Sequence, residues 1–191
     1  DCINLKSIDV SHFNTENVKN MSNIFSNCGQ LEEIDVSKFI TKNVENMSGM
    51  FNNCPLLTVI EVTNFDTTKV TDISNMFTNC KKVKIINVAN FKTDKMTNMA
   101  YLFKDCSQVS VLETSDFNTE NVRNMSHMFQ NCGSLNEVKI SKFNTKKVTD
   151  MSYMFKDSVK LTSIDVSNFD TSNVVDMSFM FYNCNRIKSF D

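Results

Sequence analysis

The chain of 191 residues has no tryptophan, one proline and only three glycines, so the residues that most often shape tight turns are scarce. Asparagine and aspartate remain to form the turns, because their short polar side chains bond to nearby backbone and tolerate left-handed backbone angles. The glycines are also too few to build a phosphate-binding loop, a dinucleotide fingerprint or a nucleophile elbow. The sequence therefore shows no motif of a nucleotide-binding protein or of a hydrolase.

Charge and long apolar runs are also lacking. The 20 basic and 22 acidic residues give a net charge of −2, so no general basic field attracts nucleic acid or acidic lipid. No apolar run is long enough to span a bilayer. The two histidines, His12 and His127, have no fixed acidic or nucleophilic neighbour, and no C-x-x-C pair exists. We therefore expect no catalytic residue, no metal site and no cofactor.

What the sequence does contain is a 26-residue motif that recurs along the whole chain without insertion or deletion. Two phenylalanines recur in every repeat, and one of them lies three residues before a cysteine position. Ser158 occupies that position once, and cysteines occupy it elsewhere: Cys2, Cys28, Cys54, Cys80, Cys106, Cys132 and Cys184. A catalytic motif is needed once, whereas a unit that stacks on copies of itself must recur. The pattern therefore predicts a repeat solenoid.

Each repeat has two halves with different apolar periodicity. Residues 31–36 (LEEIDV) alternate at period two and predict a short strand. Residues 44–51 (VENMSGMF) place apolar side chains at i, i+3, i+6 and i+7, which predicts a short helix. The position of Asn20 is Asn or Asp in every repeat, as a helix N-cap requires. The residue before each cysteine position, such as Asn27, is also Asn or Asp and predicts a left-handed helix end.

Two further columns have polar or reactive side chains. A threonine recurs at 15, 41, 67, 93, 119, 145 and 171, which indicates a hydroxyl ladder or a turn bond. The cysteines are best explained as buried free thiols that pack like small apolar side chains, since Ser158 fills the same slot. The alternative is a set of disulfides between adjacent repeats, Cys2–Cys28, Cys54–Cys80 and Cys106–Cys132.

One repeat is too short to bury its own apolar residues, so we expect the repeats to stack at the strand spacing of about 4.8 Å. The expected fold is an α/β repeat solenoid of about seven 26-residue coils, each with a short parallel strand and a short helix. We assign residues 1–191 to a single solenoid. Neither terminal unit has the polar outer face of a capping repeat, so we expect this solenoid to be a fragment of a longer repeat array.

The motif L-x2-I-x-V, followed by a segment ending in F-x-x-C, resembles the BspA-like leucine-rich repeats. The segments NMSNIF, VTDMSYMF and FDTSNVVDMS also resemble the related mycoplasma lipoprotein repeats. This resemblance covers the whole chain and implies a leucine-rich-repeat solenoid. It also implies an extracellular or cell-surface protein that serves in adhesion and in contact with host or matrix, without catalytic residues.

The exposed columns are the candidates for binding. On the strand face, the column of Ser7 turns apolar in the middle of the chain, at Val59, Ile85 and Val111. The neighbouring column of Asp9 is mostly acidic and contributes Glu61, Asn87 and Glu113 beside that patch. It also includes Asp191. A solvated acidic stripe is the plain interpretation, and a basic partner or a loosely bound cation is the alternative.

The face of the expected helix offers a second candidate. Its outward column contains Tyr101, His127, Tyr153 and Phe179, and Tyr182 lies nearby. These rings either shield the side of the solenoid or anchor a ligand.

From these columns we predict a non-catalytic surface module that binds a protein or glycan through an exposed face of the solenoid. The strand face around Ile85 is the first candidate surface, and the aromatic column with Tyr101 and Tyr153 is the second. A structural spacer or filament segment with no ligand of its own is the alternative function. End-to-end self-association of the solenoid is a further possibility, whereas nucleic acid and direct membrane insertion are not expected.

Overall fold

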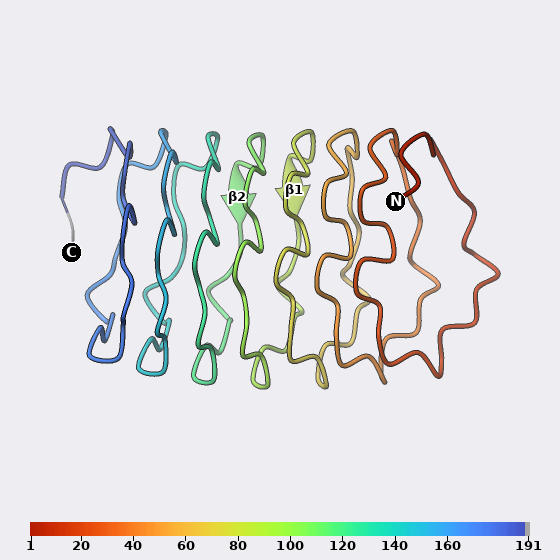
Figure 1. Ribbon diagram of the computed structural model, residues 1–191, viewed down its shortest axis with the longest axis horizontal. Helices are drawn as coiled ribbons and strands as arrows, with labels where there is room; N and C mark the ends of the chain where they lie inside the picture. The colour runs from red at the N-terminus through yellow and green to blue at the C-terminus, as the bar shows by residue number, and fades with distance from the viewer. Residues whose placement is uncertain (190–191) are drawn as a thin grey trace.

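The computed structural model describes residues 1–189 and shows one continuous stack in which each repeat makes one circuit of the chain (Figure 1). Successive circuits lie side by side, and the two ends of the chain lie at opposite ends of the stack. Parallel bridges join equivalent residues of successive repeats, from Asn20 with Asn46 to Asp150 with Asp176. The predicted solenoid is thus confirmed as an in-register stack of repeats.

Strand structure is confined to the middle of the stack. Strand β1 (Ile85–Ile86) pairs in parallel with β2 (Val111–Leu112), and Ile85 lies in register with Val111. An isolated parallel bridge joins Ile60 to Ile86. Within residues 1–189 the corresponding segments of the other repeats form no strand, so the prediction of a strand in every repeat holds only here.

The predicted short helix is absent: residues 44–51 and their equivalents form turns, and residues 1–189 contain no helix. The backbone turns left-handed twice in each repeat, for example at Asn75 (φ 59°) and Asn79 (φ 61°). A left-handed residue inside so short a segment prevents a right-handed helix from continuing. Helix nucleation is also costly, so a segment of this length has little tendency to form a helix by itself. The left-handed conformation of the residue before each cysteine position is confirmed.

The amides that a helix would use internally bond to the next repeat instead. The N–H groups of Met21, Asn23, Phe25 and Asn27 donate to carbonyls 25 residues later, at N···O distances of 2.8–3.0 Å. The same set recurs between later repeats. The Asn20 column acts as expected of a cap, since Asn20 Oδ1 accepts the Ser22 N–H at 2.8 Å, although no helix follows. Residues 20–27 and their equivalents therefore form the most regular hydrogen-bonded side of the solenoid.

The core is a set of stacked columns. The rings of Phe25, Phe51 and Phe77 form one interior file, with centroids 5.8 and 6.0 Å apart. The file continues from Phe77 through Phe103 and onward at 5.4–5.8 Å. Met47, Met50 and Phe51 are fully buried, so the side of the segment predicted to face inward is correct although its conformation is not.

The threonine column joins adjacent repeats. The hydroxyl of Thr93 accepts the N–H of Asn118 at 2.7 Å and donates to the carbonyl of the same residue at 3.0 Å. Thr15, Thr41, Thr67 and Thr119 make the same pair of bonds 25 residues ahead. The predicted hydroxyl ladder is confirmed, and it joins the backbone of successive repeats just after the phenylalanine that follows each predicted strand segment.

The cysteine column consists of free thiols. The Cys106 thiol donates to the Phe77 carbonyl of the preceding repeat at 3.1 Å. The Ser158 hydroxyl makes the equivalent bond to the Phe129 carbonyl at 2.8 Å. The position therefore requires a small side chain with a donor, which explains why serine replaces cysteine there. The free-thiol interpretation holds, and the alternative disulfide pairing is not formed.

Candidate functional site

The strand face has a compact aliphatic patch. The side chains of Val59, Ile85 and Val111 are 56%, 67% and 60% exposed, and they lie on three successive repeats. Ile85 and Val111 belong to β1 and β2, whose pairing holds them side by side. These three side chains lie on the strand face, the first candidate surface, and we call them the strand patch.

The strand patch coincides with the described strand pairs. β-branched side chains favour extended backbone, so Val59, Ile85 and Val111 also help the strands to form. The same column has serine or glutamate in the other repeats, at Ser7, Glu33, Glu137 and Ser163, and no strand forms there. The exposed side chains of Val59, Ile85 and Val111 therefore serve either strand pairing or the binding of a ligand, and mutation can separate these two roles.

Acidic side chains border the strand patch. Glu61 and Asn87 are exposed and Glu113 is half-buried. The Lys139 ammonium lies 2.8 Å from Glu113 Oε2, and this hydrogen-bonded ion pair lowers the pKa of the Glu113 carboxyl. Glu61 has no ion pair among those formed by residues 1–189. The border therefore offers one unpaired carboxylate and one neutralised carboxylate. Asp191, in the same column, lies outside the described residues.

Hollows also open on the strand face. One of about 500 Å³ lies between the first two repeats, lined by Ser7, Asp9, Ser11, Glu33 and Asp35. The Ser11 hydroxyl and N–H bond to Asp9, which lowers the pKa of that carboxyl. A smaller hollow of about 170 Å³ adjoins Val111 and is lined by Glu113, Glu137 and Lys139. The hollow beside Val111 therefore combines an apolar wall with the charged side chains of Glu113, Glu137 and Lys139.

The opposite side of the repeat carries a column of stacked aromatic rings, which we call the aromatic ridge: Tyr101, His127, Tyr153 and Phe179. Their successive ring centroids lie 4.3, 4.6 and 5.0 Å apart, with interplanar angles of 10°, 5° and 21°. Tyr101 and Tyr153 are half-buried, whereas Phe179 is 53% exposed. His127 and Tyr153 thus present the edges of their rings to solvent, because both faces of each are covered by a neighbouring ring.

All four ridge residues have left-handed backbone, with φ between 55° and 61°. This conformation costs roughly 1–3 kcal/mol for a residue other than glycine or asparagine. Sequence reasoning missed it, although Asn23, Gly49 and Asn75 in the same column were the signal. Those residue types tolerate positive φ, so their column marks a left-handed position. Ring stacking offsets part of the cost in the other repeats.

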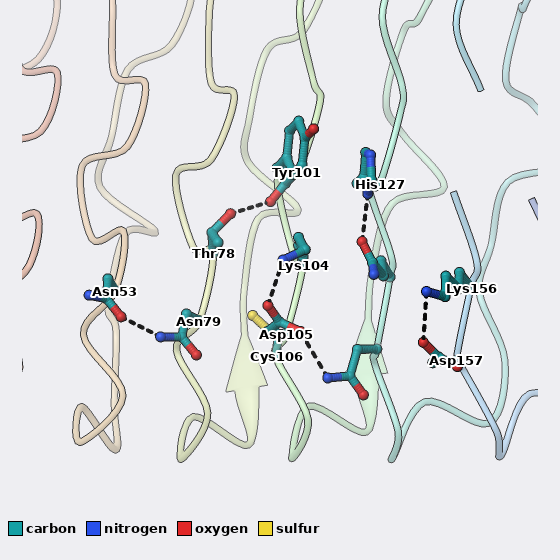
Figure 2. A network of polar contacts seen from close by, with 12 residues as sticks. Asn53, Thr78, Asn79, Tyr101, Lys104, Asp105, Cys106, His127, Lys156 and Asp157 are labelled. Carbon is teal, nitrogen blue, oxygen red and sulfur yellow. Dashed lines mark hydrogen bonds and ion pairs between the residues drawn. The ribbon is translucent and has the colours of Figure 1, made fainter. Parts of the chain in front are cut away.

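Polar contacts surround the ridge (Figure 2). His127 Nδ1 lies 2.5 Å from Gln130 Oε1, and the Thr78 hydroxyl donates to the Tyr101 carbonyl at 2.6 Å. The Lys104 ammonium lies 2.9 Å from Asp105 Oδ2. The Lys156 ammonium lies 5.4 Å from the Tyr153 ring centroid and 5.5 Å from that of Tyr182. The ridge is therefore flanked by neutralised lysines and amides.

Four of the buried cysteines, Cys54, Cys80, Cys106 and Cys132, lack the properties of nucleophiles. Burial raises the pKa of the Cys54 thiol to about 11 and that of Cys106 to about 12. Burial also raises the pKa of Cys80 and Cys132 well above the ordinary value. These thiols stay protonated at neutral pH, whereas catalysis and metal binding need thiolates. In residues 1–189, histidine, cysteine and acidic side chains form no cluster of three that could hold a metal ion.

No helix of residues 1–189 has the length and apolarity needed to cross a membrane.

The predicted site residues fall on two separate surfaces. The strand patch and its border bring together Val59, Glu61, Ile85, Asn87, Val111 and Glu113. The aromatic ridge holds Tyr101 and Tyr153.

Comparison with known proteins places the chain among repeat proteins. The model of the family described as "Mycoplasma protein of unknown function, DUF285" matches residues 1–114, 48–139 and 97–190. No curated protein matches the chain. A leucine-rich repeat protein from Eubacterium ventriosum has a similar structure, with 19% identity and a TM-score of 0.50. That match covers 78% of this chain and 42% of the other, so this chain spans less than half of that protein's length.

A second structure, a leucine-rich repeat protein from Bacteroides ovatus, has 14% identity and a TM-score of 0.34. The match covers 92% of this chain and 70% of that chain. The resemblance to BspA-like leucine-rich repeats and to mycoplasma repeats, which the sequence motif indicates, is confirmed by the family match together with the leucine-rich-repeat fold of the first structure.

Proposed function

We propose that this chain, which belongs to the DUF285 family of mycoplasma proteins, is a non-catalytic binding module of a surface protein. It serves in adhesion and binds a protein or a glycan of a host cell or matrix through an exposed face of the solenoid. The family match and the repeat fold support this role. Stacks of repeats expose long faces that can bind a partner, while the buried columns only maintain the fold.

The strand patch supports this function best and is the observation on which the proposal rests. Three adjacent repeats expose aliphatic side chains where the equivalent positions elsewhere are serine or glutamate. An apolar patch with a polar rim is a common form of a protein-binding surface. The unpaired Glu61 carboxylate at its border suits a partner with a basic group beside an apolar side chain.

The test is binding of the chain to an array of purified matrix proteins and glycans. Ile85→Asp places a charge at the centre of the patch and should weaken capture at least tenfold. Ser163→Asp, in the same column but away from the patch, is the matched control and should bind as the parent chain does. Unchanged capture by Ile85→Asp would remove the strand patch from the proposal and leave the aromatic ridge as the candidate.

Ile85→Thr separates the two roles of the patch. Threonine keeps the β-branched shape that favours the strand but replaces a methyl-bearing arm with a hydroxyl. If Ile85 serves a ligand, Ile85→Thr should lose affinity while its circular dichroism and melting temperature stay close to those of the parent. Loss of thermal stability without loss of binding would assign these residues to strand pairing alone.

A structural spacer with no ligand of its own is the second candidate. The observation that favours it is the number of bonds between repeats, since hydroxyl, amide and backbone ladders run the length of the stack. A spacer should capture nothing from the array. Val59, Ile85 and Val111 would then be replaceable by threonine with no effect on cell adhesion.

A further inference from the structure

The hydrogen-bonded side of the solenoid, residues 19–27 and their equivalents, changes its relief halfway along the stack. We call it the ladder face and number the repeats 1 to 7 along the chain. The column of Asn23 has small residues in repeats 1 to 3 and large rings in repeats 4 to 7. In chain order this column is Asn23, Gly49, Asn75, Tyr101, His127, Tyr153 and Phe179.

Asn23, Gly49 and Asn75 have no ring to project from the ladder face, and we call them the floor. The Asn23 side chain lies across Gly49, so close that a Cβ on Gly49 would be 2.2 Å from Asn23 Oδ1. The Asn23 side-chain amide therefore covers Gly49, and no aromatic ring lies there. The aromatic ridge begins directly after Asn75 and rises from the same face, since each ring stacks on the next. Ridge and floor are therefore adjacent, and the first three ridge rings match the three floor residues in number, while Phe179 extends one repeat further.

We propose that the ladder face binds a second copy of this chain, with the two stacks antiparallel about a two-fold axis that passes between repeats 3 and 4. Each ridge then lies on the floor of the other copy. Tyr101 faces Asn75, His127 faces Gly49 and Tyr153 faces Asn23. Such an isologous contact uses the same patch twice and closes after two chains.

The charges on the ladder face fit this arrangement. In the column of Lys19, the exposed Arg123 of repeat 5 faces the exposed Glu45 of repeat 2, twice in the pair. Lys19 faces Thr149, and Thr71 faces Thr97. In the column of Ser26, Lys104 faces Thr78 and Lys156 faces Ser26. No two like charges meet in these columns.

The column of Asn27 also fits. Asn79, Asn53 and Asn27 of one copy face Asp105, Asn131 and Asp157 of the other. Within one chain the same side chains already bond to one another, for example Asn131 Nδ2 to Asp105 Oδ1 at 2.8 Å. Amide donors thus meet carboxylate or amide acceptors along the contact, and the polar rim surrounds an aromatic centre as in specific interfaces.

The pairing also gives the left-handed aromatics a use. Asparagine or glycine at positions 101, 127 and 153 would relieve backbone strain, as they do in repeats 1 to 3. The rings instead leave partly exposed edges on the ladder face. Covering those edges with a second copy removes apolar surface from water.

The test is sedimentation equilibrium of the chain across micromolar to millimolar concentration. A monomer–dimer equilibrium that stops at two chains is expected. Tyr153→Asn should weaken it at least tenfold, because asparagine is native at this position in repeats 1 and 3 and suits the backbone. The strand-face variant Ile85→Asp should leave the dimer unchanged, which keeps this test separate from that of ligand binding.

Gly49→Tyr distinguishes the fitted pair from general stickiness. It extends the ridge onto the floor, and tyrosine already adopts the required backbone angle in repeats 4 and 6. The fitted pair should be abolished although the exposed aromatic surface has grown. Gly49→Asn, which places the same Cβ without a ring, should retain most of the association. Stronger association of Gly49→Tyr would overturn the proposal.

Charge reversal gives an independent readout. Arg123→Glu should weaken the dimer at least fivefold by placing like charges opposite Glu45, and adding Glu45→Arg should restore it. A chain that stays monomeric at millimolar concentration would refute the proposal. Open-ended growth beyond two chains that Tyr153→Asn does not change would also refute it, since that pattern belongs to end-to-end stacking.

Discussion

At the scale of single residues, the account depends on which ring of each repeat faces inward. Phe77 is fully buried between Phe51 and Phe103, with centroids 6.0 and 5.8 Å away. Tyr153 is half-buried on the surface, in a backbone conformation that asparagine adopts more readily. The two side chains are similar in size, so their environments decide what their removal costs.

Phe77→Ala should therefore lower the free energy of unfolding by about 3–5 kcal/mol, as truncation of a buried aromatic side chain does. Tyr153→Asn should change it by less than about 1 kcal/mol, because lost stacking is offset by relieved strain. Chemical denaturation of both variants measures the difference. Equal losses would contradict the assignment of one column to the core and the other to the surface.

The thiols give a second prediction at this scale. The buried Cys54 and Cys106 have pKa values raised by burial to about 11 and about 12, whereas Cys2 is exposed. A thiol reagent at pH 8 should modify Cys2 within minutes and the buried cysteines only as fast as the chain unfolds. Mass spectrometry of the labelled protein follows both rates. Rapid labelling of Cys106 in folded protein would show that the column is open to solvent.

Residue patterns in the sequence correctly predicted one of the two left-handed positions and the inward-facing side chains. The position before each cysteine needs a left-handed residue, and the Asn or Asp found there in every repeat was sufficient to show it. The inward direction of Met47, Met50 and Phe51 also followed from their spacing. The second left-handed position was missed, because tyrosine, histidine and phenylalanine in four repeats concealed what Gly49 and its neighbours in the column indicate.

At the scale of elements, tertiary bonds replaced the expected helix. A spacing of i, i+3, i+6 and i+7 fits one face of a helix, but it also fits two successive turns whose N–H groups bond outward. The acceptors for those amides are carbonyls of the next repeat. The apolar spacing within one repeat therefore cannot predict these hydrogen bonds. The strands were overpredicted for a related reason: apolar alternation continues in every repeat, but the described strands occur only where an outward β-branched residue, Ile85 or Val111, is present as well.

The threonine ladder gives a prediction at this scale. Thr93→Val keeps the shape of the side chain but removes both bonds to the backbone of Asn118. Because a backbone N–H and C=O then lose a partner at a part-buried place, the free energy of unfolding should fall by about 1–3 kcal/mol. Thr162→Val is the matched control: its exposed hydroxyl bonds only to the Asn136 carbonyl. It should cost less than about 1 kcal/mol.

At the scale of the whole molecule, the same turn repeats along the stack, so small effects accumulate. Several exposed aspartates are each followed, two residues along the chain, by a serine. That serine donates hydrogen bonds to the aspartate and lowers the pKa of its carboxyl below the ordinary value of 3.8. These groups include Asp9, Asp35, Asp165, Asp170 and Asp176. A lowered folded-state pKa adds stability above the unfolded value, and that stability is lost as the pH falls through the folded value.

The melting temperature should accordingly be nearly constant from pH 7 to about pH 5 and should fall below about pH 4. Differential scanning calorimetry over that range measures it. Replacing the serine partners Ser11, Ser37 and Ser167 by alanine should make the acid limb less steep, because the carboxylates then lose the hydroxyl donors that lower their pKa and keep only the backbone N–H donors. An acid limb of unchanged steepness in the triple variant would show that other groups cause it.

The central claim is that equivalent residues of successive repeats lie directly against one another along a single interior file. Nuclear Overhauser contacts between selectively labelled phenylalanine rings measure this most directly. The account predicts contacts of Phe77 with Phe51 and Phe103, and none with Phe25 or Phe129. Contacts that skip a repeat, or rings of this column with no neighbour from the same column, would contradict it.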